Sequence, residues 1–239
     1  MLGNTGLKVS EIGMGCEGFA EDGYRMTKAL FDVAEAEGIN YFDLYTSNPD
    51  VRRAVGEAMK GRREKFLVQS HICSVWQDGQ YKRTRKLDEV KAGFAEMMEL
   101  LQTDYLDVGM IHYCDALSDW EEIVSGGVLD YVRELKAEGR IRHIGISSHN
   151  PQVALKAVES GTIEVLMFSV IPAMIFSLPL RMWRSCGRRR TRSSFSVRPI
   201  WMVRVPVRKL WLRRATSSTA VLFPAGMPAL RKRCSTRIG

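Results

Sequence analysis

The sequence has no hydrophobic run as long as the roughly 18 to 20 residues that a membrane-spanning helix needs. Residues 1–6 also lack the basic and apolar regions of a secretory signal. We therefore expect a soluble, cytoplasmic protein without a membrane partner. Only five cysteines occur, an odd number with no C-x-x-C pair, which argues against a disulfide framework or a zinc ribbon and predicts reduced thiols.

Acidic residues are absent from the whole carboxyl-terminal part of the chain. All 27 Asp and Glu lie in residues 1–175 together with 19 of the 35 Lys and Arg, whereas residues 176–239 hold 16 basic residues and no acid. The formal net charge of +8 therefore averages an acidic part with a strongly basic one. We interpret residues 1–173 as one folded unit and residues 174–239 as a separate basic tail.

The first of these parts has the pattern of an α/β protein, because short β-branched runs alternate with longer segments of helical period. Six strands are predicted, at residues 11–16, 40–44, 66–71, 106–112, 142–147 and 164–169. Helices are predicted between them, at residues 24–37, 50–60, 84–102, 119–138 and 150–160. This alternation favours a parallel sheet with helices packed against it.

Polar or reactive side chains stand at the ends of these strands. They are Cys16, Asp43, Tyr45, His71, Cys73, His112, Cys114, Ser147, Ser148 and His149. The carboxyl ends of parallel strands meet at one edge of the sheet, where α/β proteins bind their ligands. We therefore expect a functional site at this edge.

A G-x-G-x-x-G loop after a strand, typical of Rossmann nucleotide sites, is missing. A different set of motifs occurs: LGxTGLxVSxIGxG at 2–15, YFD at 41–43, DYLD at 104–107 leading to IH at 111–112, and GRIRxIGIS at 139–147. In order and spacing they resemble the aldo-keto reductases over about residues 1–173. The resemblance is greatest to the branch whose full-length members carry a ferredoxin-like iron–sulfur segment.

The resemblance implies an (α/β)₈ TIM barrel that binds NADP(H) and transfers hydride to or from a small carbonyl or alcohol substrate. Six strands are predicted where the family has eight, so we expect a partial barrel. The resemblance also implies that Ser147 hydrogen-bonds the nicotinamide amide, with Ser148 in place of the asparagine that usually follows.

In this family a tyrosine is the general acid, a lysine and an aspartate tune it, and a histidine orients the substrate. The motifs place Asp43 on the aspartate and His112 on the histidine, but Asn48 stands where the tyrosine is expected and His71 where the lysine is expected. We therefore expect His112 or His71 to donate the proton near neutral pH. Tyr45, on the same strand face as Asp43, is the alternative phenol.

A metal site is a second hypothesis for the same edge. His71-Ile72-Cys73 and His112-Tyr113-Cys114 repeat an H-x-C pattern, and in extended chain residues i and i+2 point the same way. Two imidazoles and two thiolates form a tetrahedral zinc site when they converge.

The basic tail supports two interpretations. Basic runs at 188–190 and 231–233, with tryptophans among them, are compatible with binding of single-stranded nucleic acid, although the tail shows no convincing helical or strand period.

A shift of reading frame is the other interpretation, and it explains the tail with one event. Codons for residues 174–187 can be chosen so that one added nucleotide yields YDLLPAAADVEELW, an acidic string that resembles the family's continuation. We therefore favour a truncated aldo-keto reductase with a non-native tail, and we expect poor folding because six strands leave two unpaired sheet edges.

Overall fold

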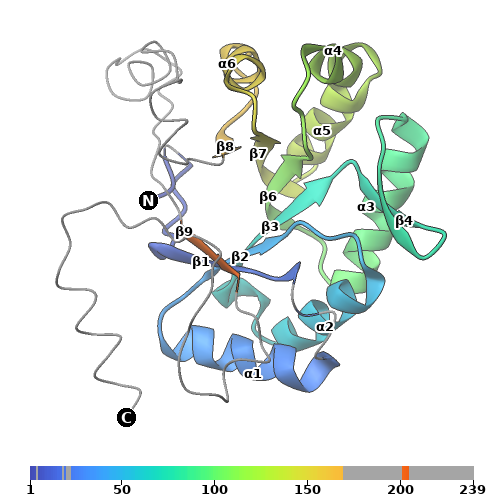
Figure 1. Ribbon diagram of the computed structural model, residues 1–239. Coiled ribbons are helices and arrows are strands. Elements are labelled where there is room, and N and C mark those ends of the chain that lie inside the picture. The colour runs from blue at the N-terminus through green and yellow to red at the C-terminus, as the bar shows by residue number, and fades with distance from the viewer. Residues whose placement is uncertain (4, 18, 20–22, 169–200, 205–239) are drawn as a thin grey trace.

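The computed structural model describes residues 1–3, 5–17, 19, 23–168 and 201–204 (Figure 1). Its main element is a parallel sheet with the strand order β8-β7-β6-β3-β2-β1-β9. The strands are β1 (Ile12–Gly15), β2 (Tyr41–Leu44), β3 (Leu67–Ile72), β6 (Leu106–Ile111), β7 (Ile141–Ser148), β8 (Val165–Phe168) and β9 (Trp201–Arg204). The first six are the six predicted strands, and they form the half-barrel that the sequence indicated.

Helices follow the strands and pack on the outer side of the sheet (Figure 1). They are α1 (Gly23–Ala36), α2 (Pro49–Met59), α3 (Leu87–Leu101), α4 (Leu117–Ser125), α5 (Val128–Ala137) and α6 (Pro151–Glu159), with a short 3₁₀ turn at Arg63–Lys65. The prediction of a single helix over 119–138 is wrong, because the helix is interrupted between α4 and α5. Gly127 has a φ of 78°, a left-handed conformation that interrupts the helical hydrogen bonds and that glycine adopts without strain.

Alternation along each strand gives the sheet two apolar faces. On β2, Phe42 and Leu44 point into the larger core between sheet and helices, where the ring of Phe42 stacks on that of Phe31 at 4.2 Å between centroids. Tyr41 belongs to a smaller cluster inside the half-barrel, together with Val108 and Met110. The polar residues of the inner face therefore lie above an apolar floor.

The two edges of the sheet differ. Strand β9 pairs in parallel with β1 from Ile12↔Trp201 to Gly15↔Arg204. The expectation that β1 is unpaired is therefore wrong, as is the expectation of no strand in the tail. Strand β9 satisfies the backbone donors and acceptors of β1. This pairing requires extended backbone in β9 but does not require that its apolar side chains alternate. At the other end of the order, β8 pairs with β7, and no described strand lies beyond it. The rest of the tail lies outside the described residues, as do Cys186 and Cys234.

A two-stranded hairpin, β4 (Ser74–Gln77) and β5 (Gln80–Arg83), projects between β3 and α3. Asp78 and Gly79 form its turn with φ values of 53° and 75°. Two consecutive left-handed residues are typical of the type I′ turn that suits a twisted hairpin. The hairpin carries residues to the site that the strand pattern alone did not predict.

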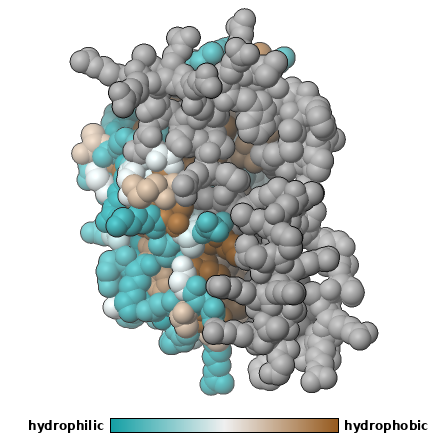
Figure 2. Space-filling model, turned by 90° about the vertical axis from the view of Figure 1, so that its left-hand side faces the viewer, coloured by the Kyte–Doolittle hydropathy of each residue, from teal (hydrophilic) through white to brown (hydrophobic). Residues whose placement is uncertain are grey.

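Within the described ranges, no helix combines the length and the apolar character needed to cross a bilayer. On the face seen in Figure 2, hydrophilic side chains cover much of the described surface, and hydrophobic ones show between them near its middle. Cys16, Cys73 and Cys114 are buried free thiols, as expected for reduced cysteines.

Candidate active site

A cleft of about 330 Å³ opens at the carboxyl ends of the strands, the edge at which the sequence predicted a site. It is lined by Gly15, Cys16, Glu17, Asp43, Tyr45, His71, His112, Tyr113, Ser147, Ser148, His149 and Met167. Six neighbouring strands or the loops that follow them contribute to this lining. The structure therefore brings together most of the predicted site residues, whereas Asn48, Cys73 and Cys114 do not line the cleft.

Asp43 lies on the inner face of β2 and is 6% exposed. Its Oδ1 accepts hydrogen bonds from Gln69 Nε2 at 2.6 Å and from the His71 ring at 3.1 Å. Gln69 is itself fixed because its Oε1 accepts from the Tyr41 hydroxyl. Gln69 and His71 are two residues apart on β3 and therefore face Asp43 together.

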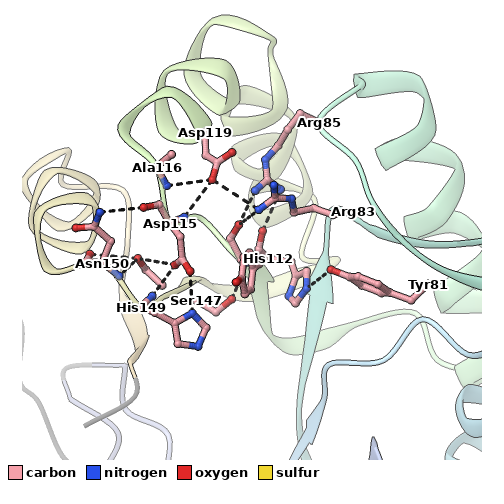
Figure 3. A network of polar contacts seen from close by, with 12 residues as sticks. Tyr81, Arg83, Arg85, His112, Asp115, Ala116, Asp119, Ser147, His149 and Asn150 are labelled. Carbon is pink, nitrogen blue, oxygen red and sulfur yellow. Dashed lines mark hydrogen bonds and ion pairs between the residues drawn. The ribbon is translucent and has the colours of Figure 1, made fainter. Parts of the chain in front are cut away.

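The two histidines are in direct contact. His71 Nδ1 and His112 Nδ1 are 2.7 Å apart, and His112 Nε2 is 2.7 Å from the Tyr81 hydroxyl. Tyr81 comes from strand β5 of the hairpin, and Figure 3 shows its hydroxyl directed at the His112 ring. Both ring nitrogens of each histidine are thus engaged by neighbouring side chains.

Burial first, and then the neighbouring His71 and Arg85, lower the pKa of His112 to about 2, from an ordinary value of 6.5. A buried imidazolium loses its hydration, so the neutral ring is favoured. This low pKa disfavours the role expected from the sequence, in which His112 donates a proton by titrating near neutrality. A neutral His112 can instead accept a proton on one ring nitrogen while it releases a proton from the other.

This lowered pKa predicts a loss of stability in mild acid. Between pH 6.5 and the native pKa, unfolding lets His112 bind a proton that the folded state excludes, so the free energy of unfolding falls as the pH drops below 6.5. The slope is at most about 1.4 kcal/mol per pH unit for one proton. Urea unfolding from pH 7.5 to 5 measures it.

In His112→Gln this slope is expected to vanish between pH 7.5 and about pH 5.5, below which carboxylates such as Glu164, whose folded-state pKa lies at about 2, begin to contribute. His149→Gln is the matched control, because the side chain of His149 is 47% exposed. Equal slopes in wild type and His112→Gln would show that His112 does not change its protonation on unfolding.

Asn48 has a structural role in the described part of the chain. Its side-chain Oδ1 accepts from the Asp50 N–H at 2.9 Å and caps the amino end of α2, with Pro49 at the first helical position. Tyr45, by contrast, lies in the cleft as its shared face with Asp43 predicted. Its ring centroid is 5.6 Å from that of His112 and 6.1 Å from that of His71.

Of the two serines predicted to contact the cofactor, Ser147 is the better placed. Its Oγ accepts from the Tyr113 N–H at 2.8 Å, so its own proton can be donated to a ligand carbonyl. Ser148 is used inside the protein, since its Oγ accepts from Asn150 N at 3.1 Å and lies 3.2 Å from Asn150 O. Met167 also lines the cleft.

The zinc hypothesis is wrong. No group of three or more His, Cys, Asp or Glu in the described ranges is placed to hold a metal. The H-x-C pattern needs extended backbone, but Cys73 has a φ of 75° and Tyr113 a φ of 50°. The backbone turns at both places, so the Cys73 and Cys114 side chains enter the hydrophobic core and do not join the imidazoles.

Tyr81 and Arg83 of the hairpin, and Arg85 just after it, were missed from the sequence. Arg85 is 8% exposed and donates to the carbonyls of His112 at 2.9 Å and Tyr113 at 2.7 Å, which fixes the loop after β6. On the other side of this loop, Asp115 accepts from the His149 N–H at 2.6 Å (Figure 3). The Asp78-Gly79 pair between alternating residues was the signal for the hairpin.

Comparison with known proteins gives a family match over residues 11–179, to the aldo/keto reductase family. Among curated proteins, the chain is 30% identical over 172 residues to the uncharacterized oxidoreductase YqkF of Bacillus subtilis. It is 32% identical over 182 residues to L-galactose dehydrogenase of Arabidopsis thaliana. Each alignment covers 70% of this chain and 54% of the relative, so the chain spans about half the length of these relatives.

Solved structures agree with the fold. An aldo-keto reductase from Bacillus halodurans in its holo form has a TM-score of 0.61 and 28% identity, over 71% of this chain and 56% of that one. An aldo/keto reductase from Klebsiella pneumoniae in complex with NADP and acetate has a TM-score of 0.56 over 74% and 60%, and at 19% identity it supports the fold alone. The family match covers more than half of the sequence, and the chain belongs to the aldo/keto reductase family.

Proposed function

We propose that the cleft is the site of an NADP(H)-linked oxidoreductase that acts on a small carbonyl or alcohol substrate. The observation that carries this proposal is the hydrogen-bonded series Asp43, His71 and His112 at the ends of neighbouring parallel strands, beside a cleft lined by Tyr45 and Ser147. Such a series moves or holds a proton beside a bound ligand, which is what carbonyl reduction and alcohol oxidation require.

Ser147 and Met167 are the residues that would hold the nicotinamide end of the cofactor. When bound, NADP(H) supplies or accepts the hydride. The choice of NADP(H) follows from the match to the aldo/keto reductase family over residues 11–179.

We further propose that the acid-free sequence after Glu164 results from a change of reading frame, and that intact relatives belong to the branch with an iron–sulfur segment. A tail of this composition has no carboxylate with which to pair its 16 basic residues. A change of frame would also replace the native residues of this part of the chain, so the phosphate end of the cofactor would lose the contacts that those residues make. Each missing charge-assisted hydrogen bond costs about 1.5–3 kcal/mol of binding.

Titration of the chain with NADPH, followed by nucleotide fluorescence, is expected to show no saturation at micromolar cofactor. A second chain, with the frame restored by one nucleotide before the codon for Met174, is expected to saturate. Ser147→Ala in the restored chain should weaken binding by roughly 10-fold or more, as expected for one lost hydrogen bond. Tight binding by the present chain would contradict the change of frame, and no binding by either chain would contradict the cofactor.

A further inference from the structure

Tyr81 extends the buried series by one member. The four side chains are joined by contacts of 3.1 Å from Asp43 to His71, 2.7 Å from His71 to His112, and 2.7 Å from His112 to Tyr81. Asp43, His71 and His112 are 6%, 2% and 4% exposed, whereas Tyr81 is 39% exposed. In the described part of the chain, a proton can therefore enter or leave this series from solvent at Tyr81 or through the cleft itself.

The chemistry of the end groups fixes the direction of every hydrogen bond. A carboxylate can only accept, so His71 donates from Nε2 to Asp43 and its Nδ1 is an acceptor. His112 must then carry its proton on Nδ1 and donate it to His71. This leaves His112 Nε2 as an acceptor for the Tyr81 hydroxyl, and all three hydrogen bonds point toward Asp43.

We propose that Tyr81 exchanges the reacting proton with the substrate oxygen, and that His112 and His71 relay it to Asp43, which holds it during hydride transfer. This inference rests on the proposed oxidoreductase function. Tyr81 is accessible for this role because its ring lies 6.3 Å from that of Tyr45, which lines the cleft, and its hydroxyl contacts His112, which does too. Tyr81 is not itself among the residues that line the cleft, and the proposal places the substrate oxygen beside His112, next to this hydroxyl.

In alcohol oxidation, the hydride leaves the carbinol carbon with its electron pair for NADP⁺, and the substrate O–H bond breaks as a new O–H bond forms at Tyr81. The original Tyr81 proton moves to His112 Nε2, the His112 Nδ1 proton moves to His71 Nδ1, and the His71 Nε2 proton moves to Asp43. After the carbonyl product leaves, the same steps in reverse return one proton to water. Reduction uses these steps in the opposite order.

The relay lets a neutral phenol work without an ammonium partner. Burial, and then the nearby Tyr45, raise the pKa of Tyr81, so a free phenolate is disfavoured there. Among the described residues that line the cleft there is no lysine to stabilise one. In the relay Tyr81 gives up one proton as it gains another, and the negative charge of Asp43 is what is neutralised.

Nitrogen-15 NMR of the full chain with labelled histidine tests the relay without substrate or cofactor. We expect His112 as the Nδ1–H tautomer, His71 as the Nε2–H tautomer, and a scalar coupling between their Nδ1 atoms across the hydrogen bond. Tyr81→Phe should shift His112 Nε2 toward the value of a free imine nitrogen and leave both tautomers unchanged. Tyr24→Phe, at a tyrosine on α1 that is 46% exposed, should leave the spectrum unchanged. A His112 Nε2–H tautomer, an imidazolium, or no response to Tyr81→Phe would overturn the relay.

Kinetics with a panel of alcohols at millimolar NADP⁺ then separates the relay from the proposed function. Tyr81→Phe should lower kcat by roughly 10²–10⁴-fold with little change in KM, the range typical of a lost acid–base group. Tyr24→Phe, at the exposed tyrosine on α1, should retain wild-type turnover, and circular dichroism confirms that both variants fold. Wild-type kcat in Tyr81→Phe would refute the role of Tyr81 while the oxidoreductase function stands. If wild type oxidises no alcohol and reduces no carbonyl, the proposed function fails. The NMR measurement of the histidine tautomers then still shows whether the hydrogen-bonded series exists.

Discussion

Replacing Asp107 by alanine is expected to lower the free energy of unfolding by about 3–5 kcal/mol, the cost of breaking a buried ion pair from one side. Asp107 is fully buried on β6 and accepts from Arg63 at 2.9 Å, from Arg142 at 2.8 Å and from the Val68 N–H at 2.9 Å. Without the carboxylate, the Val68 N–H on β3 is left buried and unpaired. Arg63, whose side chain is 15% exposed, keeps its charge with little access to water.

Urea or thermal unfolding measures this change. Asp130→Ala is the matched control, because Asp130 also pairs with an arginine, Arg133, but its side chain is 70% exposed. Exposed ion pairs contribute little, so this control should stay within about 0.5 kcal/mol of wild type. A loss of less than 1 kcal/mol in Asp107→Ala would mean that water replaces the carboxylate. The contacts of Asp107 with Arg63, Arg142 and the Val68 N–H would then add little to the stability of the protein.

The strands and most helices could be predicted from the sequence because their apolar periods reflect burial directly. On β2, for example, Phe42 and Leu44 face the helices while Tyr41 and Asp43 face the barrel interior. The break between α4 and α5 depends on the conformation of one glycine, Gly127, which the period on either side does not reveal. Strand β9 lies in a segment whose period gave no strand, and it forms because β1 offers an unpaired edge.

The candidate site could be predicted in part for a similar reason. Parallel strands guarantee that residues at their carboxyl ends converge, so Asp43, His71 and His112 were expected to be close. Which atoms meet depends on backbone turns that strand periodicity does not encode. The positive φ of Cys73 removes a thiol from the site. The hairpin that begins one residue later adds the phenol of Tyr81.

His112→Ala is expected to lower kcat by roughly 10²–10⁴-fold in the proposed reaction. The alanine breaks both contacts of the relay, leaving the Tyr81 hydroxyl without its acceptor and His71 Nδ1 without its donor. The cavity left by the ring lies beside the cleft, so added imidazole should restore part of the turnover. Rescue by imidazole separates a lost proton path from a misfolded protein, which imidazole does not repair.

The pH profile of the wild-type enzyme completes this test. Because burial keeps the pKa of His112 at about 2, the ring stays neutral from pH 5 to 8 and should add no inflection to the dependence of kcat on pH. His112 then acts through its two nitrogens in one protonation state, as a relay requires. An inflection near pH 6.5 in wild type that disappears in His112→Ala would mean that the histidine itself titrates as the proton donor. In that case Tyr81 would serve only to position the ring, and Tyr81→Phe would change kcat far less than His112→Ala does.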